Sequence, residues 1–105
     1  MSTPRQLQRS RARLFRSAGW VREKGSWGES WCYVAERDFQ GFRTVWYQAT
    51  WYPAVKNFRV FRAEKQPFAF RGPPSLEFVG RFLSGEEVMG AVQADIVLRE
   101  FGEVE

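Results

Sequence analysis

The sequence predicts a single α+β domain over residues 1–105: a basic amino-terminal helix, an antiparallel sheet of four to five strands and a carboxy-terminal helix packed on that sheet. Three patterns support this prediction. Residues 1–18 begin with a helix-start signal, residues 20–83 alternate β-branched and aromatic residues with turn residues, and residues 84–102 return to a helical spacing. A chain of 105 residues is long enough for one modest core and too short for two.

The first helix is predicted from its capping residues. Thr3 and Gln6 form a capping-box pattern, and Pro4 occupies the first helical position, where a missing N–H costs nothing. At about 100° per residue, four arginines gather on one side, opposite Leu7, Leu14 and Ala18. These arginines are Arg5, Arg9, Arg13 and Arg16. Such a charge run indicates either a solvated surface helix or a surface that faces an anionic partner.

We expect strands at residues 20–23, 30–36, 43–52, 58–63 and 75–83, with Gln66 and Pro67 breaking a long strand before residues 68–71. A second capping box, Ser84 to Glu87, starts the last helix, which Gly102 ends. Residues 43–52 are the clearest strand. Val45 and Tyr47 share one of its faces, whereas Trp46 and Tyr52 share the other with polar neighbours.

Arginine and aromatic residues also neighbour one another in the next strand, where Arg59 and Phe61 fall on one face and Arg62 on the other. Aromatic rings are sequence-tolerant platforms for unpaired bases, and adjacent arginines hold phosphates. The alternative is that these aromatics form a bulky core, because strands favour them. The candidate nucleic-acid-binding residues are Arg5, Arg9, Arg13, Arg16, Arg43, Trp46, Tyr52, Arg59, Phe61 and Arg62.

The charge is divided unevenly along the chain. Residues 1–72 hold 14 of the Lys and Arg against 5 Asp and Glu, whereas residues 73–105 hold 2 against 7. A basic body attracts polyphosphate or an anionic membrane, and its arginines favour planar phosphate contacts. We therefore expect a small protein that binds single-stranded DNA or RNA. The alternative is a regulatory protein, such as a small inhibitor or adaptor of the phage or plasmid type, that binds an acidic protein surface.

Enzyme chemistry has little support, since the chain has no His and a single cysteine, Cys32. This composition offers no Cys–His pair and no zinc ligand cluster, and no glycine spacing suits a phosphate loop or a dinucleotide site. We expect no enzyme activity, no cofactor and no metal site. The lone Cys32, the absence of an apolar leader and the absence of a long apolar run predict a cytoplasmic protein that is not inserted in a membrane.

The last helix is predicted to be apolar on two sides. Val88, Val92 and Ile96 lie in a sector suited to the sheet. A second sector contains Val97, Leu98 and Phe101 and is expected to form the interface of a homodimer. The alternative is that the first helix or a loop covers this second sector within one chain.

The order of elements over about residues 30–101, four strands followed by a helix, is similar to small single-stranded-DNA-binding proteins of the Whirly group and to transcriptional coactivators built in the same way. A local likeness lies at residues 33–41. The resemblance implies single-stranded-DNA binding and transfers no site residue. Double-stranded-RNA-binding domains share the helix, sheet, helix order, but Glu86 and Glu87 stand where such domains place phosphate contacts.

Overall fold

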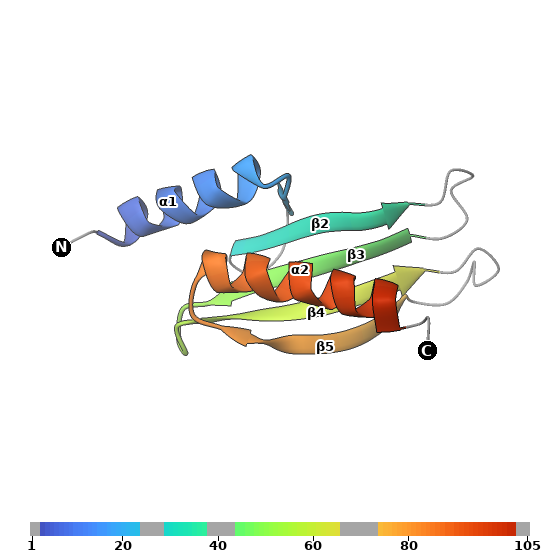
Figure 1. Cartoon of the computed structure of the whole chain (residues 1–105). Helices are drawn as coiled ribbons and strands as arrows, with labels where there is room; N and C mark the ends of the chain where they lie inside the picture. Colours follow the sequence, from blue (N-terminus) through green and yellow to red (C-terminus); the bar gives the residue numbers. More distant parts are fainter. Residues whose placement is uncertain (1–2, 24–28, 38–43, 66–73, 103–105) are drawn as a thin grey trace.

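The structure is a computed structural model that describes residues 3–23, 29–37, 44–65 and 74–102. The side chains of Pro4, Arg37 and Phe101 lie outside the described part. Its elements are α1 (Pro4–Ser17), β1 (Val21–Arg22), β2 (Glu29–Arg37), β3 (Thr44–Tyr52), β4 (Asn57–Lys65), β5 (Ser75–Phe82) and α2 (Gly85–Gly102). The strands form one antiparallel sheet in the order β1-β2-β3-β4-β5 (Figure 1), so the predicted α+β class is confirmed.

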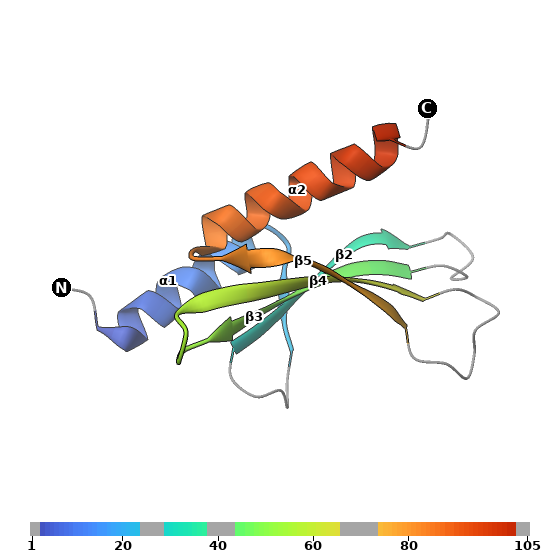
Figure 2. The same ribbon diagram turned by 90° about the horizontal axis from the view of Figure 1, so that it is seen from below.

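Both helices pack on the same face of the sheet, which we call the inner face (Figure 2). Along β3, Val45, Tyr47 and Ala49 point into this layer and are buried, while the residues between them are only partly buried. This alternation is the period-two pattern of a sheet covered on one side. The opposite face, which we call the outer face, carries neither helix.

α1 begins as its sequence predicts. The Thr3 side chain accepts a hydrogen bond from the Gln6 amide, and the Gln6 side chain accepts one from the Thr3 amide, at 3.2 and 2.8 Å. The helix is anchored by Phe15, however, and not by the predicted apolar side. Phe15 is fully buried and stacks on Trp31 with ring centroids 5.2 Å apart, whereas Leu7 is 48% exposed.

The orientation of α1 differs from the predicted one for a simple physical reason. Phe15 follows Leu14 by one position, so its burial turns the helix by about 100° from the predicted orientation. The phenyl ring buries more apolar surface than a leucine does and gains an aromatic contact with Trp31. Ala18, which was predicted on the apolar side, is exposed.

α2 lies along the inner face through Val88 and Val92, which are buried in the core beside Phe58 and Val60. Its first turn is capped, because the Glu87 amide donates to Ser84 Oγ at 3.2 Å and Glu87 Oε2 accepts from the Leu83 amide at 2.9 Å. The predicted sheet-facing sector of this helix is therefore confirmed.

A polar network fastens the carboxy-terminal half of α2 to the sheet. Tyr47 of β3 donates its hydroxyl to Asp95, and Arg99 donates from Nε to Asp95 Oδ2 at 2.8 Å. The same guanidinium contacts Glu77 of β5 at 2.6 Å. Arg99 thus joins α2 to β5 through Glu77, while Asp95 joins α2 to β3 through Tyr47, and both contacts of Arg99 are charge-assisted.

Strand boundaries differ from the sequence prediction in two ways. β1 has two residues, fewer than predicted, whereas β4 extends from Asn57 to Lys65 and is longer than predicted. The predicted break at Gln66 and Pro67 and the strand at residues 68–71 lie outside the described residues, as does Arg43.

The Tyr47–Asp95 contact predicts a defined pH dependence of stability. Burial and the bond to Asp95 raise the pKa of Tyr47 from 10.0 to about 12, so the stability that this phenol contributes is complete below pH 10 and is lost as the pH rises through 12. Burial tends to raise the pKa of Asp95, but the bonds from Tyr47 and Arg99 lower it overall. Its contribution is therefore present above about pH 4 and is lost as the pH falls through the lowered value.

Tyr47→Phe should be less stable than the wild type at neutral pH, because Asp95 loses a donor, and should lose little further stability between pH 10 and 12. Urea unfolding of both proteins at a series of pH values measures this difference. Parallel alkaline profiles for the two proteins would contradict it.

Candidate nucleic-acid interface

The outer face is arranged in rows that run across the strands. Strand pairing places Trp46 between Val34 and Ala63, Gln48 between Cys32 and Phe61, and Thr50 between Ser30 and Arg59. On β5 the same rows continue to Leu76, Phe78 and Arg81. Because directly paired residues share a face, these side chains all project from the same side of the sheet.

One end of this face is apolar and exposed. Phe78 is 51% exposed and Leu76 is 63% exposed. The Phe78 ring contacts Phe61 with centroids 5.3 Å apart, and Trp46 is partly buried among its neighbours. A half-exposed phenylalanine on a sheet surface is not a core residue. Phe78 is therefore a surface aromatic.

The other end of the outer face is cationic. Arg59 and Arg81 stand directly opposite each other on β4 and β5. The Arg59 guanidinium carbon lies 4.5 Å from the centre of the Tyr52 ring, and that of Arg81 lies 6.0 Å from the Phe78 ring. Both distances fall in the range of cation–π contacts, which orient a guanidinium without neutralising it.

The structure brings four of the predicted binding residues together on one face and places Arg62 and the predicted arginines of α1 elsewhere. Trp46, Tyr52, Arg59 and Phe61 share the outer face. Arg62 projects from the inner face, on the side of β4 opposite Arg59 and Phe61 as predicted, and pairs with Glu64 at 3.1 Å. Its position follows from the alternation along β4, which places Arg62 one residue out of step with Arg59 and Phe61.

Phe78 and Arg81 were missed by the sequence prediction, and a β-bulge is the reason. They are three residues apart, so strict alternation along a strand places them on opposite faces. The register shifts where Val60 pairs with Gly80 and Phe61 pairs with Phe78, which leaves Val79 as the extra residue. This bulge turns both side chains to the outer face.

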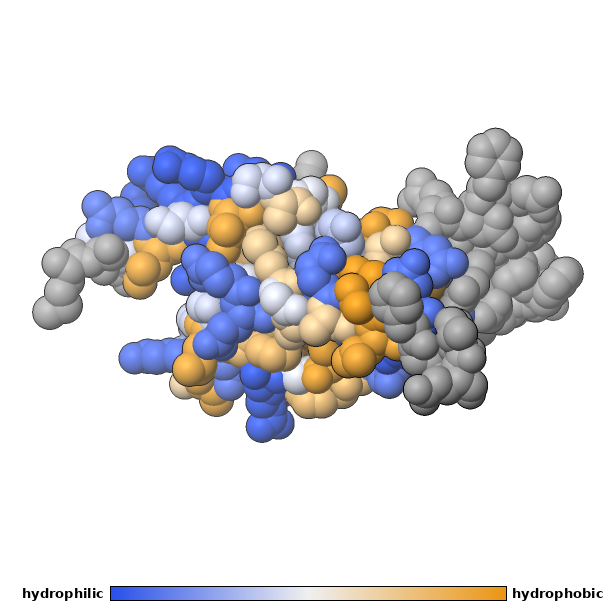
Figure 3. All heavy atoms as spheres, viewed as in Figure 1, coloured by the Kyte–Doolittle hydropathy of each residue, from blue (hydrophilic) through white to orange (hydrophobic). Residues whose placement is uncertain are grey.

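The predicted arginines of α1 form a second basic surface, which we call the α1 strip. Arg5, Arg9, Arg13 and Arg16 are all exposed. Figure 3 shows hydrophilic side chains along the upper margin of the molecule, where α1 lies in Figure 1, and this helix packs on the inner face. The strip is therefore separate from the outer face, and one short ligand cannot contact both.

Arg11, on the same helix, has a structural role. It contacts the buried Glu29 at 3.0 Å and lies 4.6 Å from the centre of the Trp51 ring. Glu29 also accepts a hydrogen bond from Trp31 Nε1 at 3.0 Å. A buried carboxylate is thereby satisfied by two donors, and α1 is bound to the sheet by charge as well as by Phe15.

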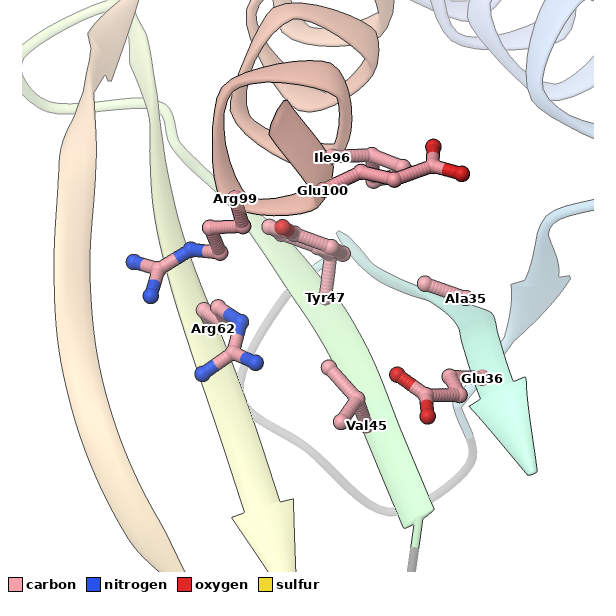
Figure 4. Close-up of a pocket in the computed structure, with 8 residues that line it drawn as sticks. All are labelled: Ala35, Glu36, Val45, Tyr47, Arg62, Ile96, Arg99 and Glu100. Carbon is pink, nitrogen blue, oxygen red and sulfur yellow. The ribbon is translucent and has the colours of Figure 1, made fainter. Parts of the chain in front are cut away.

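The inner face has a cleft of about 420 Å³ beneath the end of α2 (Figure 4). Tyr47, Arg62 and Arg99 line it, together with Glu36 and Glu100. Because acidic and basic side chains alternate around this cleft, it does not favour an anionic ligand. A smaller cleft of about 250 Å³ separates α1 from the β5–α2 junction.

The outer face also contains Cys32. Burial, and secondarily the nearby Glu23 carboxylate, raise the pKa of its thiol from 9.0 to about 11. The thiol is therefore protonated at neutral pH and is a poor nucleophile. Among the described residues no group of three or more His, Cys, Asp or Glu side chains is placed to hold a metal ion. In the same residues, no helix is both long enough and apolar enough to cross a membrane.

The second apolar sector of α2 faces outward. Val97 is 46% exposed and Leu98 is 69% exposed, so α1 does not cover them. Ala94 is also exposed, and apart from the neighbouring residues and backbone of its own helix no atom of the described residues lies within 4 Å of the position that a Cβ on Gly90 would take. The side chain of Phe101, the third predicted interface residue, lies outside the described part.

The chain matches no protein-family model, no curated protein and no solved structure. The geometry itself therefore defines the class of protein: an α+β domain with both helices on one face of a five-stranded antiparallel sheet, whose other face carries aromatic and arginine side chains.

Proposed function

We propose that this protein binds single-stranded nucleic acid on the outer face of its sheet. The observation that carries the proposal is the exposed Phe78, which adjoins Phe61 and lies one row from Arg81 on a face that neither helix covers. Trp46 continues the aromatic surface onto β3. Exposed rings beside unpaired arginines are the combination that holds stacked bases and their phosphates.

The exposed aromatic surface favours a single strand over a duplex. A duplex presents base edges in its grooves, whereas an aromatic platform needs an unpaired base whose ring face is accessible. Stacking is worth about 1–3 kcal/mol per base and tolerates any base. Phosphate contacts add an affinity that falls with salt concentration.

The α1 strip suits a supporting role in the same function. Its arginines are exposed, but they belong to a different side of the molecule. A ligand long enough to pass from the outer face around the sheet edge would place further phosphates on them. A short ligand would be held by the outer face alone.

A protein-binding role is the second candidate, and a different observation favours it. Leu76 and Val34 are exposed aliphatic side chains on the outer face, and aliphatic groups stack poorly on bases. Under this alternative the apolar end of the outer face meets a partner, and the α1 strip meets acidic side chains of that partner.

We also propose that α2 mediates a homodimer. Gly90 lies inside the helix, where glycine costs about 1 kcal/mol relative to alanine, and nothing within the described chain requires its lack of a side chain. The small residues Gly90 and Ala94 are followed by the exposed Val97 and Leu98. Antiparallel packing of two copies would place the large side chains of each over the small residues of the other.

The stacking proposal predicts that Phe78→Ala weakens binding of an oligothymidylate by roughly 5- to 150-fold, the equivalent of about 1–3 kcal/mol, with little change in thermal stability. Phe15→Ala is the matched control, because this buried ring should cost about 3–5 kcal/mol of folding stability. Fluorescence titrations and thermal melts separate the two effects. Full binding by folded Phe78→Ala would reject the stacking role.

For the α1 strip, changing Arg5, Arg9 and Arg16 together to Gln should reduce the salt slope for a long single strand by up to about 2, at about 0.7 per phosphate. Binding of an oligomer of about six nucleotides should be unaffected, because this length covers one face only. The substitutions should leave folding almost unchanged, since the side chains are exposed. Identical slopes for the long strand would exclude the strip from binding.

For the dimer, light scattering should give a mass that rises above 12.3 kDa with concentration. Leu98→Glu should hold the protein at the monomer mass, because it buries a charge in the interface. Gln93→Glu adds the same charge to an exposed position on the flank of α2 and is the control. A wild-type mass of one chain at every concentration would show that α2 is not an interface.

A further inference from the structure

Two arginines are held face to face on the outer surface of the sheet. Arg59 and Arg81 are directly paired across β4 and β5. Like charges at directly opposed sheet positions destabilise the pair. Within the described ranges no carboxylate forms an ion pair with either guanidinium. The fold therefore concentrates positive charge here and leaves it without an intramolecular counterion.

Two polar side-chain atoms beside this pair of arginines also lack hydrogen-bond partners. Arg59 Nε is buried and has no hydrogen-bond partner, and neither has Asn57 Oδ1, two residues away on the same strand face. Such atoms normally find partners, because an unmade bond costs roughly 1–3 kcal/mol. Tyr52 supports one face of the Arg59 guanidinium, so the N–H groups at its edge are held in a fixed direction.

We infer that Arg59 and Arg81 form a binding site for the phosphodiester backbone of single-stranded nucleic acid. The inference rests on the proposed function and assigns its phosphate contacts. A guanidinium presents a planar fork of donors that matches two phosphate oxygens. An anion between the two arginines would remove their repulsion. Arg59 Nε and Asn57 Oδ1 are buried and out of reach of a ligand, so the phosphate contacts are assigned to the terminal guanidinium nitrogens.

The rows of the outer face also give the direction of the strand. Arg59 and Arg81 form one row across the sheet, and Phe61 with Phe78 forms the neighbouring row, about 7 Å away along the strands. A ligand with its phosphates on the first row and its bases on the second must run across the β-strands. The polynucleotide therefore crosses β3, β4 and β5 at a steep angle, with successive bases over different strands.

Salt titrations of an oligothymidylate of about six nucleotides test the phosphate site. Arg59→Gln with Arg81→Gln should reduce the salt slope by about 0.7 if the pair shares one phosphate and about 1.4 if each holds its own. Arg59→Lys with Arg81→Lys retains the charge and should retain most of the slope. Arg5→Gln with Arg9→Gln removes the same charge from α1 and should leave the slope unchanged. Inorganic phosphate should compete only weakly, since it lacks the stacked bases.

The outcomes separate this site from the function on which it rests. An unchanged slope in the outer-face variant, with Phe78→Ala still weakening binding, would overturn the phosphate site and leave the proposed function standing. An equal decrease in the α1 variant would show a general charge effect and would also overturn the site. Failure of the wild type to bind any single strand would reject both proposals.

Photocrosslinking tests the direction. A photoreactive thymine analogue, moved one position at a time along the oligomer, should crosslink in turn to peptides of β3, β4 and β5. Crosslinks that progress along a single strand would overturn the crossing arrangement.

Discussion

The burial of Phe15 is the contact on which the arrangement of layers depends. Its ring stacks on Trp31 of β2, meets Phe58 of β4 edge-on and lies beside the first turn of α2. Gly85 permits this approach, since a Cβ there would lie 2.9 Å from a methyl group of Leu14 and 3.5 Å from the Phe15 ring. A single aromatic side chain thus joins the first helix, the sheet and the second helix.

This junction holds both helices on one side of the sheet. The other side is therefore left without a covering helix. A five-stranded sheet has two faces, and both helices of the described residues lie on one of them. The outer face is consequently left with aromatic side chains that the strands favour but the core does not use. The candidate binding surface is therefore the uncovered face of the same sheet and requires no additional structural element.

Much of the fold could be predicted because its signals are local. The Thr3 and Ser84 caps, the alternation in β3 and the turn residues between strands each depend on a few neighbouring residues. The outer-face positions of Trp46, Tyr52, Arg59 and Phe61 followed from the same alternation. The rotation of α1 could not be predicted, because the competition between Phe15 and Leu14 for the core is decided by Trp31 and Phe58, which are distant in sequence.

The β5 contribution could not be predicted for a different reason. A bulge has no firm sequence signature in this strand, and the extra residue Val79 is recognised only from pairing with β4. Without that information, period two separates Phe78 from Arg81. The most exposed aromatic side chain of the candidate interface, and one arginine of its cationic end, therefore emerged only from the strand register.

The bulge at Val79 lets the two side chains share a face at a spacing that a regular strand would not allow. Deletion of Val79 would leave Phe78 and Arg81 two residues apart, so that a regular strand without the bulge would keep both on the outer face with the same β4 partners. No side chain of the interface would have changed. Homologous chains with and without this extra residue can therefore present the same surface, and they should be compared by register before they are compared by residue position.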